Sequence, residues 1–210
     1  MPHPKKRIKI ILQGLFFCIL LQGCTIESTN YYPDRQEDGL AIFSNTGNNL
    51  MTAYANNIPW QTRPRSVTVV LSSVKRYEVM LRKYNFNGIK DTLELQWTGD
   101  QSANGNSTGD LGLSMIFPKG FGYRDFNALQ GKRLAVDLNN GYFTATIGNL
   151  NAGNVKGIGM VYFHTAALDS TGPGIYSGKI SGLIEADFNG NKITKGRFDH
   201  TINSDQVFFR

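Results

Sequence analysis

Short stretches that alternate apolar and polar side chains constrain the fold of this chain more than any other feature. In Thr92–Trp97, leucine and tryptophan take one face of an extended strand, and glutamate and glutamine take the other. The β-branched run Val67–Leu71 and the run Gly157–His164 are also typical of strands. Helix signals are weak, since Tyr123–Leu129 offers one or two turns at most. We therefore expect an all-β protein.

Asn-Gly pairs between strand-like runs indicate how these strands are connected. Both residues tolerate a positive φ, so the pair favours a tight hairpin turn. With 23 glycines in 210 residues, frequent turns predict an antiparallel β-sandwich or a flattened β-barrel with short hairpins and at most one short helix. The polar segment Gly99–Gly112 is expected to form a long loop. The predicted hairpins are Asn140-Gly141, between the runs 133–138 and 142–147, and Asn189-Gly190, between the runs 179–188 and 193–202.

The first 23 residues have the pattern of an export signal. Four basic residues lie within residues 5–9, and an apolar run from Ile10 to Leu21 follows. A small residue, Gly23, ends the segment, and this order predicts a secretory signal peptide that is removed. The apolar run has about 12 residues, against the roughly 20 that a membrane-spanning helix needs. The sequence therefore favours export over a transmembrane anchor.

The end of this segment, Leu21-Gln22-Gly23-Cys24, resembles the signal of bacterial lipoproteins. The resemblance implies cleavage between Gly23 and Cys24 and acylation of the Cys24 side chain with a fatty acid such as palmitate. The next residues carry no aspartate at the second position, which resembles the outer-membrane class of lipoproteins. The expected location is the cell envelope, anchored to the outer membrane, with the periplasmic and surface faces both open. An ordinary signal peptide with a coincidental cysteine is the alternative.

Removal of residues 1–23 changes the charge balance of the chain. Four of the 22 basic residues and none of the 16 acidic residues lie in this segment, so 18 basic residues remain and the net charge falls from +6 to +2. Basic clusters are absent after Cys24, and nucleic acid is therefore not an expected partner. Cys24 is then the one remaining cysteine, so stability must come from an apolar core. We expect three parts: a signal at 1–23, a lipidated flexible tether at 24–39, and a single β-domain at 40–210.

Two stretches of the β-domain resemble uncharacterised lipid-anchored proteins of Gram-negative bacteria, of the type found in Bacteroidetes. The first is Phe43–Thr62, which ends in a Trp-x-Thr element and has Asn57 where those proteins have a turn glycine. The second is Ile180–Asp199, in which a Ser-Gly strand is followed by a turn and a strand ending Gly-x-Phe-Asp. The resemblance implies an all-β lipoprotein fold. It implies no activity and no catalytic residue.

The residues offer little support for catalysis or metal binding. His164 and His200 are the two histidines after Cys24, each lies in a strand-like run, and neither has a second ligand at short spacing. Glu185 and Asp187 share one face of a strand, as paired acids of a glycosidase could, but their surroundings are typical of a solvated face. Serine is plentiful, but a serine without an identifiable base and orienting group is not evidence for nucleophilic catalysis. We expect a protein that is not an enzyme and has no cofactor and no metal site.

Aromatic side chains provide the best candidates for ligand contact. Trp60 and Tyr123 are candidate contact residues, with packing inside the β-domain as the alternative for each. Trp97 is expected in the core. The expected function is a non-catalytic binding or accessory module for an envelope protein or a glycan. The alternatives are a structural subunit of an envelope assembly, a lipocalin-like carrier of an apolar ligand and, last, a glycoside-active enzyme.

Overall fold

The computed structural model describes residues 31–62, 81–86, 90–101, 108–150, 152–173, 175–202 and 207–208. Within these ranges the chain is built almost entirely of strands, as predicted. Its regular elements, in chain order, are β1 (Leu50–Ala55), β2 (Ile58–Gln61), β3 (Leu81–Phe86), β4 (Lys90–Gln101), β5 (Thr108–Pro118), α2 (Tyr123–Asn127), β6 (Arg133–Val136), β7 (Gly141–Ala145), the 3₁₀ turn η1 (Gly148–Leu150), β8 (Ile158–Gly172), β9 (Ile175–Phe188), β10 (Asn191–Ile202) and β11 (Val207–Phe208).

The strands form one sheet that almost closes on itself. Its order is β11-β3-β4-β2-β1-β10-β9-β8-β6, and β5 and β7 extend from β4. All pairs are antiparallel except β11 with β3. A single bridge between Phe143 of β7 and Gly157, just before β8, joins the two ends, with two hydrogen bonds of 2.9 Å. The fold is therefore a nearly closed, flattened barrel.

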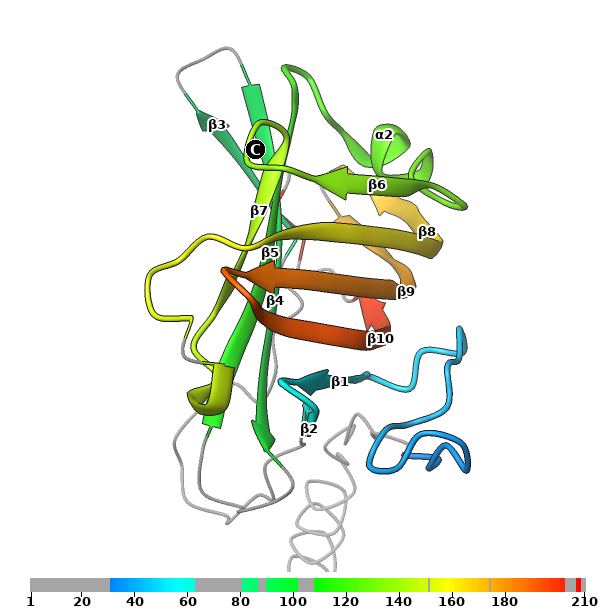
Figure 1. Ribbon diagram of the computed structural model, residues 1–210. Helices are drawn as coiled ribbons and strands as arrows, with labels where there is room; N and C mark the ends of the chain where they lie inside the picture. The colour runs from blue at the N-terminus through cyan, green and yellow to red at the C-terminus, as the bar shows by residue number, and fades with distance from the viewer. Residues whose placement is uncertain are drawn as a thin grey trace, which may run out of the picture.

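The barrel has two layers whose strands cross steeply (Figure 1). One layer contains β6, β8, β9 and β10, and the other contains β4, β5 and β7 (Figure 1). Such crossed layers arise because twisted sheets turn corners where strands bend or bulge. Register shifts occur between Ile193 and Gly196 in β10 and between Phe163 and Thr165 in β8.

Apolar side chains fill the space between the layers. The predicted alternation of β4 is confirmed, because Leu93, Leu95 and Trp97 are at most 1 % exposed. Small barrels of this kind are commonly filled by their own side chains. The largest fully buried side chains are Trp60, Trp97, Phe126, Phe143, Phe163, Phe188, Phe198, Leu40, Met51, Leu93 and Leu95.

One of the two predicted hairpins is confirmed and the other is wrong. The β9–β10 hairpin turns through Asn189 (φ 55°) and Gly190 (φ 93°), as the sequence predicts. The strands on either side of Asn140-Gly141 do not pair with each other. Instead β6 pairs with β8 and β7 pairs with β5, so this turn is a corner between the two layers.

Two other expectations concern loops and the helix. The long loop expected at Gly99–Gly112 is shorter than predicted, since Gly99 of β4 pairs with Gly109 of β5. The single turn α2 agrees with the weak helix signal at Tyr123–Leu129. The predicted strand Val67–Leu71 lies outside the described residues. No helix in the described ranges has the length and apolar character needed to span a membrane.

Candidate functional site

An exposed apolar surface lies on the outer side of the layer that contains β8 and β9. We call it the outer patch and define it by Ile158, Met160, Tyr162 and Leu183. Ile158 is 46 % exposed, and Met160 and Leu183 are each 38 % exposed. Scattered surface hydrophobics are normal, but a contiguous group of them marks a candidate interaction site.

The strand register places these side chains next to one another. Leu183 of β9 lies directly opposite Tyr162 of β8 on one side and Arg197 of β10 on the other. Tyr162 in turn lies opposite Arg133 of β6. Directly opposed residues on one sheet face have Cβ atoms about 5 Å apart. The outer patch is therefore continuous across β8 and β9, with Arg133 of β6 and Arg197 of β10 on its two sides.

A groove of about 450 Å³ runs over the outer patch and is bordered by charged side chains. Glu185 and Arg133 line it from the sheet, and Lys195 and Glu37 form an ion pair of 2.5 Å at its edge. Glu185 lies opposite Met160 in the register. An apolar centre with a charged border is the usual anatomy of a protein–protein interface.

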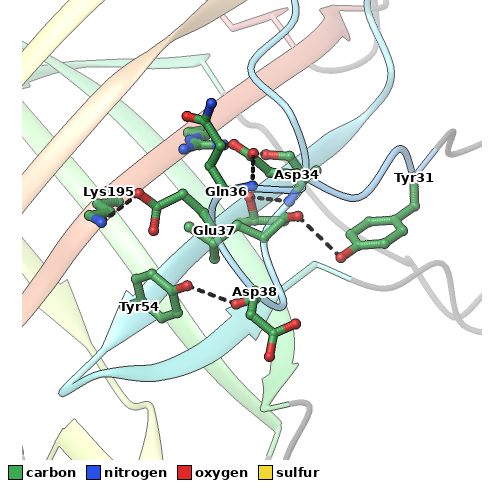
Figure 2. Close-up of polar contacts among 11 residues, drawn as sticks. Tyr31, Asp34, Gln36, Glu37, Asp38, Tyr54 and Lys195 are labelled. Atoms are coloured by element: carbon green, nitrogen blue, oxygen red, sulfur yellow. Dashed lines mark hydrogen bonds and ion pairs between the residues drawn. The ribbon is translucent and has the colours of Figure 1, made fainter.

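Glu37, which lines one side of the groove, belongs to a segment before β1. We call residues 31–42 the strap, and it folds back on itself through the bridge between Pro33 and Ala41. Arg197 of β10 donates to the Asp34 carboxylate at 2.5 Å and to the Ala41 carbonyl at 2.7 Å. Figure 2 shows Lys195 reaching Glu37, and Tyr54 of β1 donating to the Asp38 carbonyl at 2.7 Å. Residues 31–39 belong to the expected tether, and here they lie against β1 and β10.

These contacts shift two pKa values. The Gln36 backbone N–H, which donates to the Asp34 carboxylate at 2.8 Å, and the Arg197 guanidinium lower the pKa of Asp34. Burial of its ring and the neighbouring Glu37 carboxylate raise the pKa of Tyr54, so this phenol stays protonated and donates to the strap. The strap is thus held by charged and neutral hydrogen bonds together.

The next part of the chain is held by a second carboxylate. Asp199 of β10 is 5 % exposed and accepts hydrogen bonds from the backbone N–H groups of Thr46 (3.1 Å), Gly47 (2.8 Å) and Asn48 (3.1 Å). The Ser44 hydroxyl donates to the same carboxylate. Because the carboxylate is fully used by this loop, its role is to fix the chain between the strap and β1.

The two aromatic candidates from the sequence lie away from the outer patch. Trp60 of β2 is 0 % exposed, so its ring is a core residue and cannot contact a ligand at the surface. Tyr123 begins α2, is half-buried, and packs against Tyr176 with ring centroids 5.5 Å apart. The Arg124 guanidinium lies 5.8 Å from the centre of the Tyr123 ring. Tyr123 therefore closes one end of the barrel rather than lining the groove.

The two histidines have different surroundings. His200 of β10 is 2 % exposed, and its Nε2 accepts a hydrogen bond of 3.0 Å from the Trp97 indole N–H. Burial lowers the pKa of His200 to about 4, although the nearby Asp199 carboxylate acts in the opposite direction. His164 of β8 is exposed and packs edge-on against Phe43, with centroids 5.3 Å apart. Across the described ranges no three His, Cys, Asp or Glu side chains are grouped to hold a metal ion.

The carboxylate pair of β9 is divided between two roles. Asp187 accepts from the Gly190 backbone N–H at 2.6 Å and lies 4.0 Å from the Lys192 ammonium, so it stabilises the β9–β10 turn. Glu185 points to the groove. Asp187 therefore belongs to the β9–β10 turn and Glu185 belongs to the groove.

Cys24 and Gly23, the predicted lipidation and cleavage residues, lie outside the described residues. Comparison with known proteins gives no match to any family model, curated protein or solved structure.

The outer patch was missed by reasoning from the sequence. A signal for it exists in β9, where Lys179, Glu185 and Asp187 are polar positions that are not buried, and Leu183 on the same face is apolar. One exposed leucine carries little information by itself. Its meaning depends on Met160 and Tyr162, which the register brings beside it from another strand.

Proposed function

We propose that this protein is a lipid-anchored, non-catalytic envelope protein that binds another protein through the outer patch. The observation that carries the proposal is the contiguous exposed surface of Ile158, Met160, Tyr162 and Leu183, with charged side chains around it. Methionine is well suited to such a surface because its flexible side chain adapts to a partner. Cys24, through its lipid, would hold the protein at the outer membrane.

The interior of the barrel argues for this function over the carrier alternative. A lipocalin-like carrier needs a hollow, apolar barrel. Here Trp60, Trp97, Phe163 and Phe198 are buried side chains between the layers, at most 1 % exposed. A glycan ligand has a weaker case at the outer patch, since sugars bind best on stacked aromatic rings and this surface offers one, Tyr162.

Anchoring would strengthen a weak interaction. A lipid confines the protein to the membrane plane and raises its effective concentration for partners in the same membrane. A single acyl chain anchors weakly and two or more anchor stably. A modest patch is then sufficient, provided that the partner is also at the membrane.

Site-specific photo-crosslinking in the native host tests this proposal. A photoreactive residue at Ile158 is expected to give one discrete protein adduct, and Leu183→Asp is expected to abolish it. The matched control is Ile175→Asp, which changes another exposed isoleucine (49 % exposed) at the start of β9. Cys24→Ala should weaken the adduct because it removes the anchor.

The outcomes separate the candidate functions. An adduct that survives Leu183→Asp, or no adduct at all, contradicts a protein-binding patch. A carbohydrate adduct at Ile158 would replace the protein partner with a glycan.

A further inference from the structure

An exposed pair of side chains lies at the end of the strap where the chain enters and leaves it. The Ile42 N–H donates to the Tyr32 carbonyl at 2.8 Å, next to the bridge between Pro33 and Ala41. Tyr32 and Ile42 are therefore opposite each other in a two-stranded ribbon and point to the same side. Tyr32 is 55 % exposed and Ile42 is 47 % exposed. Tyr31, directly before them, is 42 % exposed.

The strap holds these side chains in a fixed position on the barrel. Its Asp34 pairs with Arg197 and its Glu37 pairs with Lys195, both of β10. The Tyr31 hydroxyl donates to the Leu40 carbonyl at 3.2 Å, so this ring is held beside the fully buried Leu40 (Figure 2). The exposed aromatic surface therefore moves with the barrel.

The position of Cys24 in the sequence places this surface near the membrane. Tyr31 lies seven positions after Cys24 in the sequence. A fully extended chain spans at most about 3.6 Å per residue, so the two Cα atoms are within about 25 Å of each other in any conformation. If Cys24 is acylated, its backbone lies at the headgroup level, and Tyr31 is within about 25 Å of that level, so it can reach the headgroups.

We propose that Tyr31, Tyr32 and Ile42 form a surface that contacts the lipid headgroups of the membrane and fixes the orientation of the barrel on it. The inference rests on the lipid anchor of the proposed function. Tyrosine is enriched at membrane–water interfaces because its ring is apolar and its hydroxyl is polar. Ile42 adds an apolar side chain beside Tyr32.

The orientation has a consequence for the outer patch. Glu37 belongs to both the strap and the wall of the groove. Glu37 lies five positions after Tyr32, so the side of the groove that it lines is within about 18 Å of the surface that contacts the membrane. The partner that fits the groove is a protein domain close to the same membrane rather than one that approaches from the far end of the barrel.

Spin labelling of the full lipidated protein tests the proposal. The mature chain has no thiol besides Cys24, whose sulfur is occupied by the lipid, so one introduced cysteine takes one nitroxide. Tyr32→Cys and Ile42→Cys are the test positions, and Leu138→Cys is the matched control. Leu138 is 53 % exposed in the turn between β6 and β7, at the far end of the sheet order from the strap.

The readout is the ratio of nitroxide collisions with oxygen to collisions with a water-soluble nickel chelate, in vesicles of phosphatidylethanolamine and phosphatidylglycerol. We expect this ratio to rise at residues 32 and 42 and to keep its aqueous value at residue 138. Two positions are tested so that the result does not depend on one variant that folds poorly. A thermal melt of each variant confirms that it is folded.

Three results are distinguishable. An acylated protein, shown by the mass of its N-terminal peptide, with aqueous ratios at 32 and 42 overturns the membrane-contact surface and leaves the anchor intact. A protein that is not acylated and stays off the vesicles overturns both. Crosslinking at Ile158 reports separately on the outer patch, so a failure there leaves the membrane contact standing.

Discussion

Inside the barrel, the indole N–H of Trp97 donates to Nε2 of His200 at 3.0 Å. Trp97 belongs to β4 and His200 to β10, so the bond links the two layers of the barrel through its core. Nε2 can accept this bond only when it carries no proton, so the contact requires a neutral ring. Protonation of Nε2 of His200 would therefore break a hydrogen bond between the two layers.

Acid is expected to destabilise the protein through His200. The folded state lowers the pKa of His200 from 6.5 to about 4, so folding disfavours the protonated ring. The neutral His200 ring makes its full contribution to the free energy of unfolding above pH 6.5. This contribution is lost as the pH falls toward 4. A difference of this size corresponds to about 3 kcal/mol in the free energy of unfolding. Urea denaturation between pH 4 and 7 measures it, and His200→Phe should flatten the profile.

The exposed histidine is the matched control for this measurement. His164→Gln changes a ring at the surface of β8, and its pH profile should follow that of the wild-type protein. An unchanged profile in His200→Phe would show that the acid sensitivity has another source.

Removal of the Asp199 charge is expected to loosen the loop before β1. Asp199 accepts bonds from three backbone N–H groups and one hydroxyl, and an amide nitrogen cannot accept any of them. We expect Asp199→Asn to lower the free energy of unfolding by about 2 kcal/mol. Asp187→Asn, which affects one bond from Gly190, should cost less. If urea denaturation shows equal losses in the free energy of unfolding for the two variants, the role given to Asp199 is wrong.

The strap depends more on Arg197 than on Lys195. The Arg197 side chain is 16 % exposed and bonds both Asp34 and Ala41 of the strap, whereas the Lys195 side chain is 51 % exposed and pairs with Glu37 of the strap and with the Tyr54 ring of β1, whose centre is 5.9 Å away. Exposed ion pairs contribute little to stability. Arg197→Met should therefore speed amide hydrogen exchange at residues 34–42, and Lys195→Met should change it little. The reverse order would mean that Glu37 holds the strap.

Gly182 is expected to tolerate no side chain. An added Cβ would lie 2.0 Å from the Tyr162 carbonyl oxygen on the neighbouring strand and 2.7 Å from the Phe198 ring. Relief requires the backbone of β8 to move, so Gly182→Ala should cost at least about 2 kcal/mol. At Gly172 the nearest atom would be the end of the Ile175 side chain, at 3.6 Å. Gly172→Ala is thus the control, and similar thermal shifts for both variants would count against this reasoning.

The sequence predicted local structure better than strand partners. The burial of Leu95 and the turn at Asn189-Gly190 follow from alternation and from positive φ angles, which depend on neighbouring residues. The turn at Asn140-Gly141 has the same local chemistry, yet its flanking strands separate into the two layers. A turn fixes the direction of the chain, and the packing of distant segments decides which strands pair.

The same limit applies to the candidate site. Met160 and Leu183 are 23 residues apart in the sequence, and they lie on neighbouring strands because of the β8–β9 register. A surface of this kind exists only after the strands have paired. Residues 31–39 of the strap are expected as tether from the sequence, because Asp34 and Glu37 find their partners on β10, more than 150 residues later.

The barrel closes through the single bridge between Phe143 and Gly157, and we call this junction the seam. These residues are 14 positions apart, so the loop between them loses little chain entropy when the bridge forms. An added Cβ at Gly157 would lie 2.6 Å from the Phe188 ring, and a larger residue would hold the seam open. Opening at this point breaks two backbone bonds and leaves the β8–β9–β10 ladder intact. Closure of the barrel at this edge therefore depends on two backbone hydrogen bonds, and they lie directly beside Ile158 of the outer patch.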